Sequence, residues 1–200
     1  LIDPQLQLTP FVRDGGTFAP GEPLLQIAGA AASILMAERV ALNFAGRMCG
    51  IATLTAAHVA QTAGTKARIT CTRKTTPGLR ALEKYAVRCG GGVNHRMSLS
   101  DAALVKDNHV VSAGGVAAAF ARVRAAFPGI PVEVEVDSLD QLDEVLAAAN
   151  GRTVTVGGGA QVTLALAGAT LLCGGRGGLL LLNVSLMEED GARCVTIPDP

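Results

Sequence analysis

The sequence lacks net charge, paired-cysteine motifs and a signal-type start, and each absence argues against a class of protein. Its 17 lysines and arginines balance 17 aspartates and glutamates, which argues against a general nucleic-acid binder. The five cysteines are odd in number and form no C-x-x-C motif, so we expect reduced structural thiols in a cytoplasmic protein. The first residues show no basic, apolar signal pattern, and Leu179–Leu182 is far too short to span a membrane. We therefore expect neither nucleic acid nor a membrane among the partners.

The charges that are present are distributed unevenly along the 200 residues. Residues 66–109 contain nine lysines and arginines against three acids, whereas residues 131–147 contain six acids and no lysine or arginine. A basic block followed by an acidic block suits an anionic substrate accompanied by a divalent metal. Three of the basic residues, Arg80, Lys84 and Arg88, are expected instead to solvate a helix face.

The order of strand-like and helix-like segments predicts an α/β fold. A helix is expected over about 35–63, where Gly46 and Gly50 permit a bend or a close backbone neighbour. Strand-like runs then alternate with helix-like runs, which predicts a parallel sheet or an α/β barrel. The expected strands are 67–71, 102–105 and 132–136; the expected helices run from Pro77 to the glycines at 90–92, over 116–127, and from a cap formed by Ser138 with Gln141.

The two ends of the chain differ from this centre. Residues 1–34 carry turn signals without a start signal, so we interpret them as the tail end of an N-terminal domain whose beginning is absent. Residues 35–150 are expected to form the core of this parallel sheet or α/β barrel. Residues 151–200 carry glycine runs and few charges, and an insertion, retained non-coding sequence or a change of frame would each explain them.

The stretch Thr72–Arg80 is the most informative motif. It places Arg73 and Lys74 among threonines, after a strand-like run and before a helix-like one. Hydroxyls and backbone N–H groups at such a place hold phosphate or carboxylate oxygens, and the cations neutralise them. The threonines and Gly78 favour anion binding over a merely solvated surface pair.

Further candidates follow this loop in chain order. His95 and Arg96 come after a triple glycine, and an arginine can direct two donors at one carboxylate. Lys106 ends an apolar strand, where an anion-binding cation, a Schiff-base nucleophile and an ion pair with Asp107 are the alternatives.

Two glutamates complete the candidate set. Glu133 and Glu135 alternate with valines, so they share one face of a strand. They would point into the interior of a barrel, or they would face solvent on an ordinary edge strand. Glu135 is the favoured functional residue of the two.

Taken in order, these motifs resemble the quinolinate phosphoribosyltransferases, the decarboxylating enzymes that make nicotinate mononucleotide. The resemblance is nearly continuous from about Leu35 to Leu146. It implies an open α/β barrel preceded by the remnant of an α/β sandwich, and a glycosyltransferase of the phosphoribosyltransferase type. The matching stretches are Glu38–Asn43, Thr72–Arg80, Asn94–Arg96, Lys106–His109 and Glu133–Val136.

The resemblance also implies roles for particular residues. Lys106 and Glu135 would be the catalytic pair, and Glu135 would meet the ribose hydroxyls and Mg²⁺ of phosphoribosyl pyrophosphate, with water as a possible bridge to the metal. Arg39 would reach the neighbouring site across the interface of a homodimer or larger homo-oligomer. The implied binding residues for quinolinate and phosphoribosyl pyrophosphate are Arg39, Thr72, Arg73, Lys74, His95, Arg96, Lys106 and Glu135.

The family pattern fades after about Asn150. Leu182 stands where the family has an aspartate, and no Ala-Ser-Gly-Gly phosphate turn is present. We therefore expect a poor catalyst. Three alternatives stay open: a transferase for another pyridine or pyrimidine acid, a lysine-dependent barrel aldolase, and a chain that binds a ligand or partner subunit without turnover.

Overall fold

The computed structural model describes residues 2–65, 67–149, 155–159, 170–174 and 181–185, with side chains described as far as residue 149. It shows the mixture of helices and strands expected of an α/β fold. Contacts divide the chain into two compact units. The first joins Leu1–Gln61 to Thr76–Gly92, and the second joins Thr62–Thr75 to Val93–Pro200.

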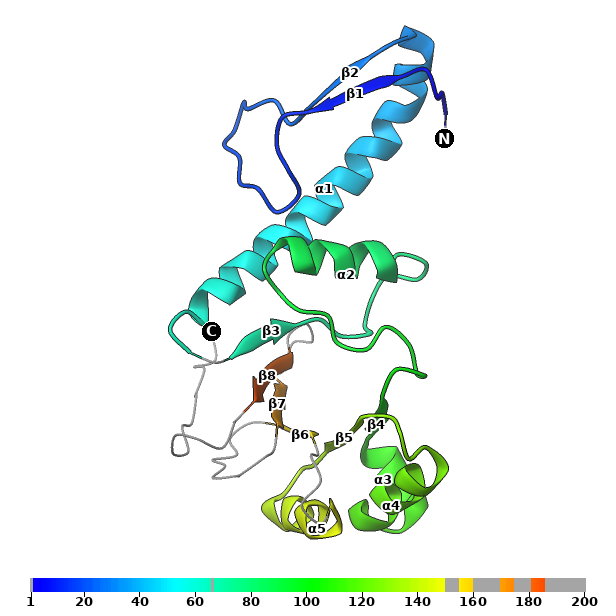
Figure 1. Ribbon diagram of the computed structural model, residues 1–200, viewed down its shortest axis with the longest axis vertical. Coiled ribbons are helices and arrows are strands. Elements are labelled where there is room, and N and C mark those ends of the chain that lie inside the picture. The colour runs from blue at the N-terminus through cyan, green and yellow to red at the C-terminus, as the bar shows by residue number, and fades with distance from the viewer. Residues whose placement is uncertain (1, 66, 150–154, 160–169, 175–180, 186–200) are drawn as a thin grey trace. The chain divides into compact units, whose positions relative to one another are not determined.

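The first unit contains a hairpin and two helices (Figure 1). Strands β1 (Gln7–Pro10) and β2 (Leu25–Ala28) pair antiparallel. Helix α1 (Ala31–Gln61) begins before the predicted Leu35, and α2 (Arg80–Cys89) begins after the predicted Pro77. Pro77 lies instead in the turn that precedes α2, beside Gly78 with its positive φ of 78°.

Gly90, which follows α2, packs directly against α1. A Cβ atom there would lie 2.3 Å from the carbonyl oxygen of Ala52 and 2.7 Å from Cβ of Thr55. Only a residue without a side chain fits such a contact. The predicted role of Gly46 and Gly50 as points of close approach is wrong within the described structure, because a Cβ at either would meet nothing within 4 Å.

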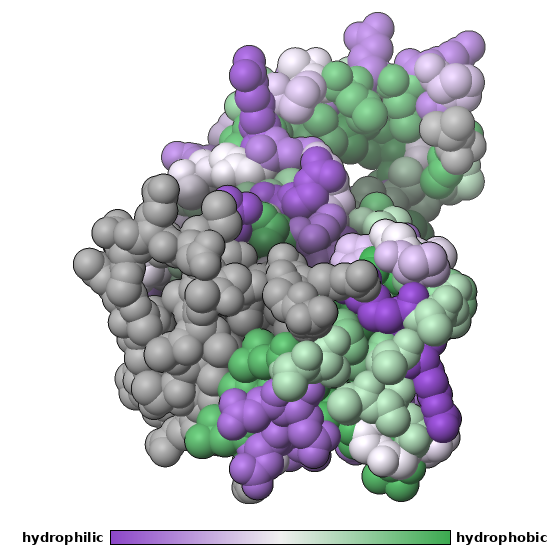
Figure 2. All heavy atoms as spheres, turned by 60° about the horizontal axis from the view of Figure 1, so that its bottom comes forward, coloured by the Kyte–Doolittle hydropathy of each residue, from purple (hydrophilic) through white to green (hydrophobic). Residues whose placement is uncertain are grey.

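Much of the apolar surface of α1 is not covered by the described chain. Val40 and Phe44 are exposed, whereas Thr55 is buried. Figure 2 shows hydrophobic surface, in green, beside polar residues, in purple, on the part of the chain that holds the hairpin and the start of α1. By length and composition α1 could cross a membrane, a property that core helices of soluble proteins share. The absence of a membrane partner stays a prediction.

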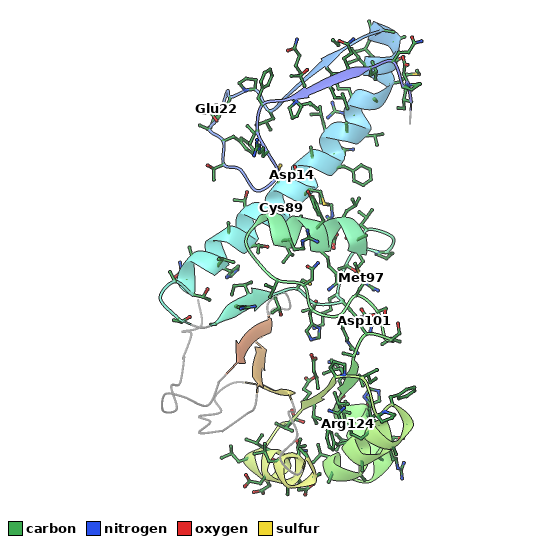
Figure 3. All side chains as sticks on the ribbon, in the orientation of Figure 1. Asp14, Glu22, Cys89, Met97, Asp101 and Arg124 are labelled. Atoms are coloured by element: carbon green, nitrogen blue, oxygen red, sulfur yellow. The ribbon has the colours of Figure 1, made fainter. Side chains whose placement is uncertain are left out.

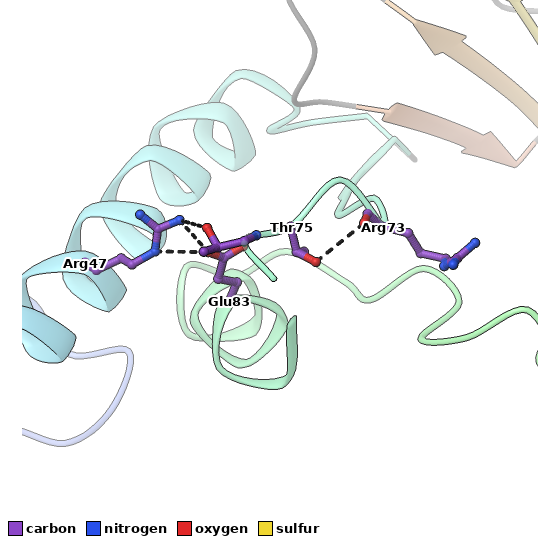
Figure 4. A network of polar contacts seen from close by, with 5 residues as sticks. Arg47, Arg73, Thr75 and Glu83 are labelled. Atoms are coloured by element: carbon purple, nitrogen blue, oxygen red, sulfur yellow. Dashed lines mark hydrogen bonds and ion pairs between the residues drawn. The ribbon is translucent and has the colours of Figure 1, made fainter. Parts of the chain in front are cut away.

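A polar network connects α1 to α2 and to Thr76, in the middle of the Thr72–Arg80 stretch (Figure 4). Nε of Arg47 donates to Oε1 of Glu83 at 3.0 Å, and the backbone N–H of Thr76 donates to Oε2 at 3.2 Å. Burial would raise the pKa of Glu83, but the bonds from Arg47 and Thr76 outweigh it, and the pKa is lowered. Lys84, predicted to be solvated, is buried at 1% exposure, because α2 turns this face inward.

The second unit contains a six-stranded sheet in the order β3-β8-β7-β6-β5-β4. Strands β4 to β7 run parallel, as predicted, but β8 is antiparallel to both β7 and β3. The connection from β7 to β8 is only residues 175–180, and a parallel crossover needs about a dozen residues or more. The strands are β3 (Arg68–Thr70), β4 (Ala103–Val105), β5 (Val132–Glu135), β6 (Thr155–Gly159), β7 (Thr170–Gly174) and β8 (Leu181–Ser185).

Three helices accompany this sheet: α3 (Asp107–Ala113), α4 (Val116–Ala126) and α5 (Leu139–Ala149). The valines of β5 are buried in one core with Phe120 of α4 and Val145 of α5, so the predicted division of β5 into a valine face and a glutamate face is confirmed. Helix α3 was not predicted. Its first turn is closed by Nδ1 of His109, which accepts the N–H of Lys106 at 2.9 Å.

The predicted cap of α5 is present in a shifted form. Oγ of Ser138 accepts the N–H of Gln141 at 3.2 Å, as expected. The side chain of Gln141, however, accepts from the N–H of Asp137 at 2.7 Å, one residue before the position that a capping box predicts. Closure of the sheet into an open barrel and the domain ranges 1–34, 35–150 and 151–200 stay predictions.

Candidate anion-binding site

The site is built where the Thr72–Thr75 loop leaves β3 in the second unit. The segment that begins at Val93 runs parallel to the end of this strand: the N–H of Val93 donates to Ile69 at 2.9 Å, and the N–H of Cys71 donates to Val93 at 3.2 Å. This pairing brings the residues after Val93 alongside the residues after Cys71. Two basic motifs separated in sequence therefore meet at the end of one strand.

The loop itself is shaped by its threonines. Oγ1 of Thr72 accepts the backbone N–H of Lys74 at 3.0 Å, a local bond that closes a tight turn. Lys74 is exposed and Arg73 is half-buried. The predicted binding residues Thr72, Arg73 and Lys74 thus form one turn at a strand end, where open α/β sheets place their ligands.

Arg96 lies within electrostatic range of Arg73. Burial lowers the pKa of Arg96 most, and the positive charge of Arg73 lowers it further, while Glu133 and Asp101 act in the opposite sense. Nη1 of Arg96 donates to the carbonyl of Ala102 at 2.7 Å, which holds the guanidinium in place. An arginine remains charged in spite of such a shift. The two arginines therefore make a positive centre suited to an anion.

The loop between Arg96 and β4 is held by Asp101. Its Oδ2 accepts the backbone N–H groups of Met97 at 2.7 Å and Ser98 at 3.0 Å. Figure 3 labels Met97 and Asp101 at the two ends of this loop. The loop is thus a compact turn, which keeps the carbonyl of Ala102 in position for Arg96.

The two glutamates of β5 hold two different basic groups. Oε1 of Glu133 contacts Nε2 of His95, and Oε2 of Glu135 lies 2.9 Å from Nζ of Lys106. Of the alternatives for Lys106, the ion pair with Asp107 is not the one formed, since the ammonium group is paired with Glu135. β5 lies between β4 and β6, so the edge-strand interpretation of the glutamates is wrong.

The two pairs differ in their exposure to water. Lys106 and Glu135 have side chains that are 45% and 46% exposed, whereas those of His95 and Glu133 are 10% and 11% exposed. An exposed pair contributes little stability, about 0–1 kcal/mol, so an anionic ligand competes readily for Lys106. The strand ends thus present Arg73, Arg96 and Lys106 as cations, with Glu135 as an accessible carboxylate.

The structure places all but one of the predicted site residues in the second unit, where contacts join His95 to Glu133 and Lys106 to Glu135, and Arg96 lies in the field of Arg73. Thr72, Arg73, Lys74, His95, Arg96, Lys106 and Glu135 lie in the second unit around the ends of β3, β4 and β5. Arg39 is exposed on α1 in the first unit. Glu133 was ranked below Glu135 in the sequence analysis. One signal in the sequence pointed to it: Glu133 lies on the same strand face as the candidate Glu135, among valines expected to be buried.

The fold and the site together define a class of protein. The chain is an α/β protein with basic side chains at the carboxyl ends of its strands. This arrangement is typical of proteins that bind phosphorylated or carboxylated small molecules.

The chain belongs to the quinolinate phosphoribosyltransferase family. The model of the family's C-terminal domain matches residues 51–156, and that of its N-terminal domain matches residues 1–49. The aldolase alternative is therefore not supported.

Relatives with similar sequences carry names consistent with this family. The nicotinate-nucleotide pyrophosphorylase (carboxylating) of Mycobacterium leprae is 59% identical over 136 residues, covering 68% of this chain and 48% of the relative. A probable enzyme of the same name from Bacillus subtilis is 44% identical, covering 74% and 52%. The crystal structure of NadC from Streptococcus pyogenes matches with a TM-score of 0.77 at 38% identity, covering 88% and 64%. The chain spans about half the length of the curated relatives it matches.

Proposed function

We propose that the site binds quinolinate and phosphoribosyl pyrophosphate for phosphoribosyl transfer with decarboxylation, a step of NAD biosynthesis that yields nicotinate mononucleotide, pyrophosphate and CO₂. The observation that carries this proposal is the positive centre of Arg73 and Arg96, together with Lys106, which follows β4. Quinolinate is a dicarboxylate, and its partner is a polyphosphate. Both require several cations within one site.

The arrangement supports a mechanism without a protein nucleophile. The ring nitrogen of quinolinate forms the bond to the ribose carbon as the bond to pyrophosphate breaks. The carbon–carbon bond to the carboxylate next to the ring nitrogen then breaks, and CO₂ leaves. The electron pair of that bond stays on the ring carbon until a proton arrives. Arg73, Arg96 and Lys106 stabilise the negative charge of the carboxylates and of this carbon, because fixed cations in a partly dehydrated site need no rearrangement.

Magnesium fits this site as a companion of the pyrophosphate. Mg²⁺ is usually held by one or two carboxylates together with substrate phosphates, and Glu135 offers one accessible carboxylate. The residues whose side chains are described contain no cluster of three or more metal-ligating groups. When bound, the ion would neutralise charge on the leaving pyrophosphate. Glu135 would also accept hydrogen bonds from the ribose hydroxyls.

Two further parts of the proposal concern the setting of the protein. We propose a homodimer or larger homo-oligomer in which Arg39 reaches the site of a neighbouring copy, since it is exposed on α1. We also propose a cytoplasmic location, although the matched Nicotiana glauca relative is named as mitochondrial.

Isothermal titration calorimetry with quinolinate tests the proposed site. The folded chain should bind quinolinate at low salt, and binding should weaken as ionic strength rises because charge attraction is screened. Arg96→Lys should weaken quinolinate more than phosphoribosyl pyrophosphate, because lysine keeps the charge but loses the two-pronged geometry. Absence of quinolinate binding by a folded sample at low salt contradicts the proposal, and equal loss for both ligands contradicts the role of Arg96.

A further inference from the structure

Glu133 is a buried carboxylate on an interior strand. Burying a charged group costs free energy, so we expect a role that compensates this cost. Its backbone lies in register with Leu104 of β4 on one side and Thr155 of β6 on the other. Its side chain is 11% exposed, and Oε1 contacts Nε2 of His95. Within the part of the chain whose side chains are described, the second oxygen, Oε2, is buried without a hydrogen-bond partner. Burying a carboxylate with incomplete hydrogen bonding costs stability, so a hydrophobic residue would be the more stable choice here.

The contact with His95 has a direct chemical consequence. A carboxylate accepts but does not donate, so the bond requires the hydrogen of the ring to be on Nε2. It also fixes the rotation of the ring. A carboxylate behind a histidine commonly sets its tautomer and orientation in this way.

We propose that Glu133 is a positioning residue that holds His95 in one tautomer and one orientation for recognition of a ligand carboxylate; this rests on the proposed function of the same site. Glu133 also acts electrostatically on Arg96, which lies one residue from His95. The carboxylate therefore contacts His95 directly and acts on Arg96 through its charge alone. Glu135 differs because it is accessible and pairs with Lys106.

Nuclear magnetic resonance of the histidine side chains tests the positioning directly. The chain has only three histidines, and His95→Gln assigns the resonance of His95. The wild-type spectrum should show hydrogen on Nε2, with a low-field shift caused by the carboxylate. Glu133→Gln preserves the size and an acceptor oxygen but removes the charge, so this signal should move upfield. An unchanged signal in Glu133→Gln overturns the proposal.

Ligand binding separates a positioning role from a general structural one. Glu133→Ala should raise the Kd for quinolinate about tenfold, the effect of one misoriented charge-assisted hydrogen bond, while the Kd for inorganic pyrophosphate stays within about twofold. Glu133→Gln should bind quinolinate within about threefold of wild type, since its amide oxygen still accepts from Nε2. Equal loss for both ligands, or wild-type affinity in Glu133→Ala, overturns the proposal.

Matched controls keep these outcomes distinct. Glu144→Gln removes an exposed charge from α5 and should change neither the His95 resonance nor quinolinate affinity. If Glu133→Ala does not fold, the resonance shift in Glu133→Gln still decides the question. If the wild-type chain fails to bind quinolinate, the proposed function fails, while the resonance experiment still tests the coupling of Glu133 to His95.

Discussion

Tyr85 is the only tyrosine of the chain, and it is joined to the N-terminal segment by one hydrogen bond. Its hydroxyl, on α2, donates to Oδ2 of Asp14, and Asp14 lies near Cys89 (Figure 3). This bond and the negative charge of Asp14, with a smaller contribution from Cys89, raise the pKa of Tyr85 to about 12. Because the pKa is higher in the folded state, this interaction stabilises the fold fully at pH values below the ordinary tyrosine pKa of 10. The stabilisation is lost as the pH rises through about 12.

A spectrophotometric titration of tyrosinate absorbance checks this assignment at the residue scale. The single tyrosine of the wild-type chain should ionise near pH 12, and Asp14→Asn should move the midpoint down towards the ordinary tyrosine value, because the negative partner is removed. Glu22→Gln, which removes another exposed acid of the same N-terminal segment, should leave the midpoint unchanged. A wild-type midpoint equal to that of Asp14→Asn contradicts the hydrogen bond.

At the scale of elements, the contact between α1 and α2 depends on a glycine outside either helix. Gly90→Ala would force a methyl group against the backbone of Ala52, so we expect the free energy of unfolding to fall by about 1–3 kcal/mol. Gly46→Ala is the matched control: its Cβ meets nothing within 4 Å, and alanine in a helix interior should stabilise by about 0.5–1 kcal/mol. Urea denaturation measures both. A loss of stability in Gly46→Ala as large as that in Gly90→Ala would contradict the placement of the contact.

At the scale of the whole molecule, we expect the chain to bind its substrates but to convert them slowly. The basic residues of the proposed site are present, but the aspartate and the phosphate turn expected after residue 150 are not recognisable in the sequence. Since alignment of the reactants supplies much of the rate, we expect turnover at least about 100-fold below that of the Mycobacterium leprae relative assayed in parallel. The assay measures nicotinate mononucleotide formed from quinolinate, phosphoribosyl pyrophosphate and magnesium. Equal rates would mean that residues 151–200 supply the missing groups in another form.

Local patterns predicted most of the described elements because each depends on neighbours in the chain. The alternation of Glu133 and Glu135 with valines predicted a strand with one buried face, and Ser138 predicted the start of α5. Helix α3 was missed because its seven residues are too few to show a periodic pattern. The predicted exposure of Lys84 failed because a charged residue on a short helix reveals nothing of what packs against that helix.

The sequence by itself determined the family, the strand-loop-helix order and the identity of the cationic residues, because these are encoded in short motifs whose chemistry is local. Only the tertiary structure decided which groups meet. Whether Lys106 pairs with Asp107 or Glu135, and whether His95 meets Glu133, depends on strand order and register, which place residues tens of positions apart side by side. Neighbouring strands lie about 4.8 Å apart. At that spacing, the pairing of strands rather than distance along the chain selects the partner of each charge.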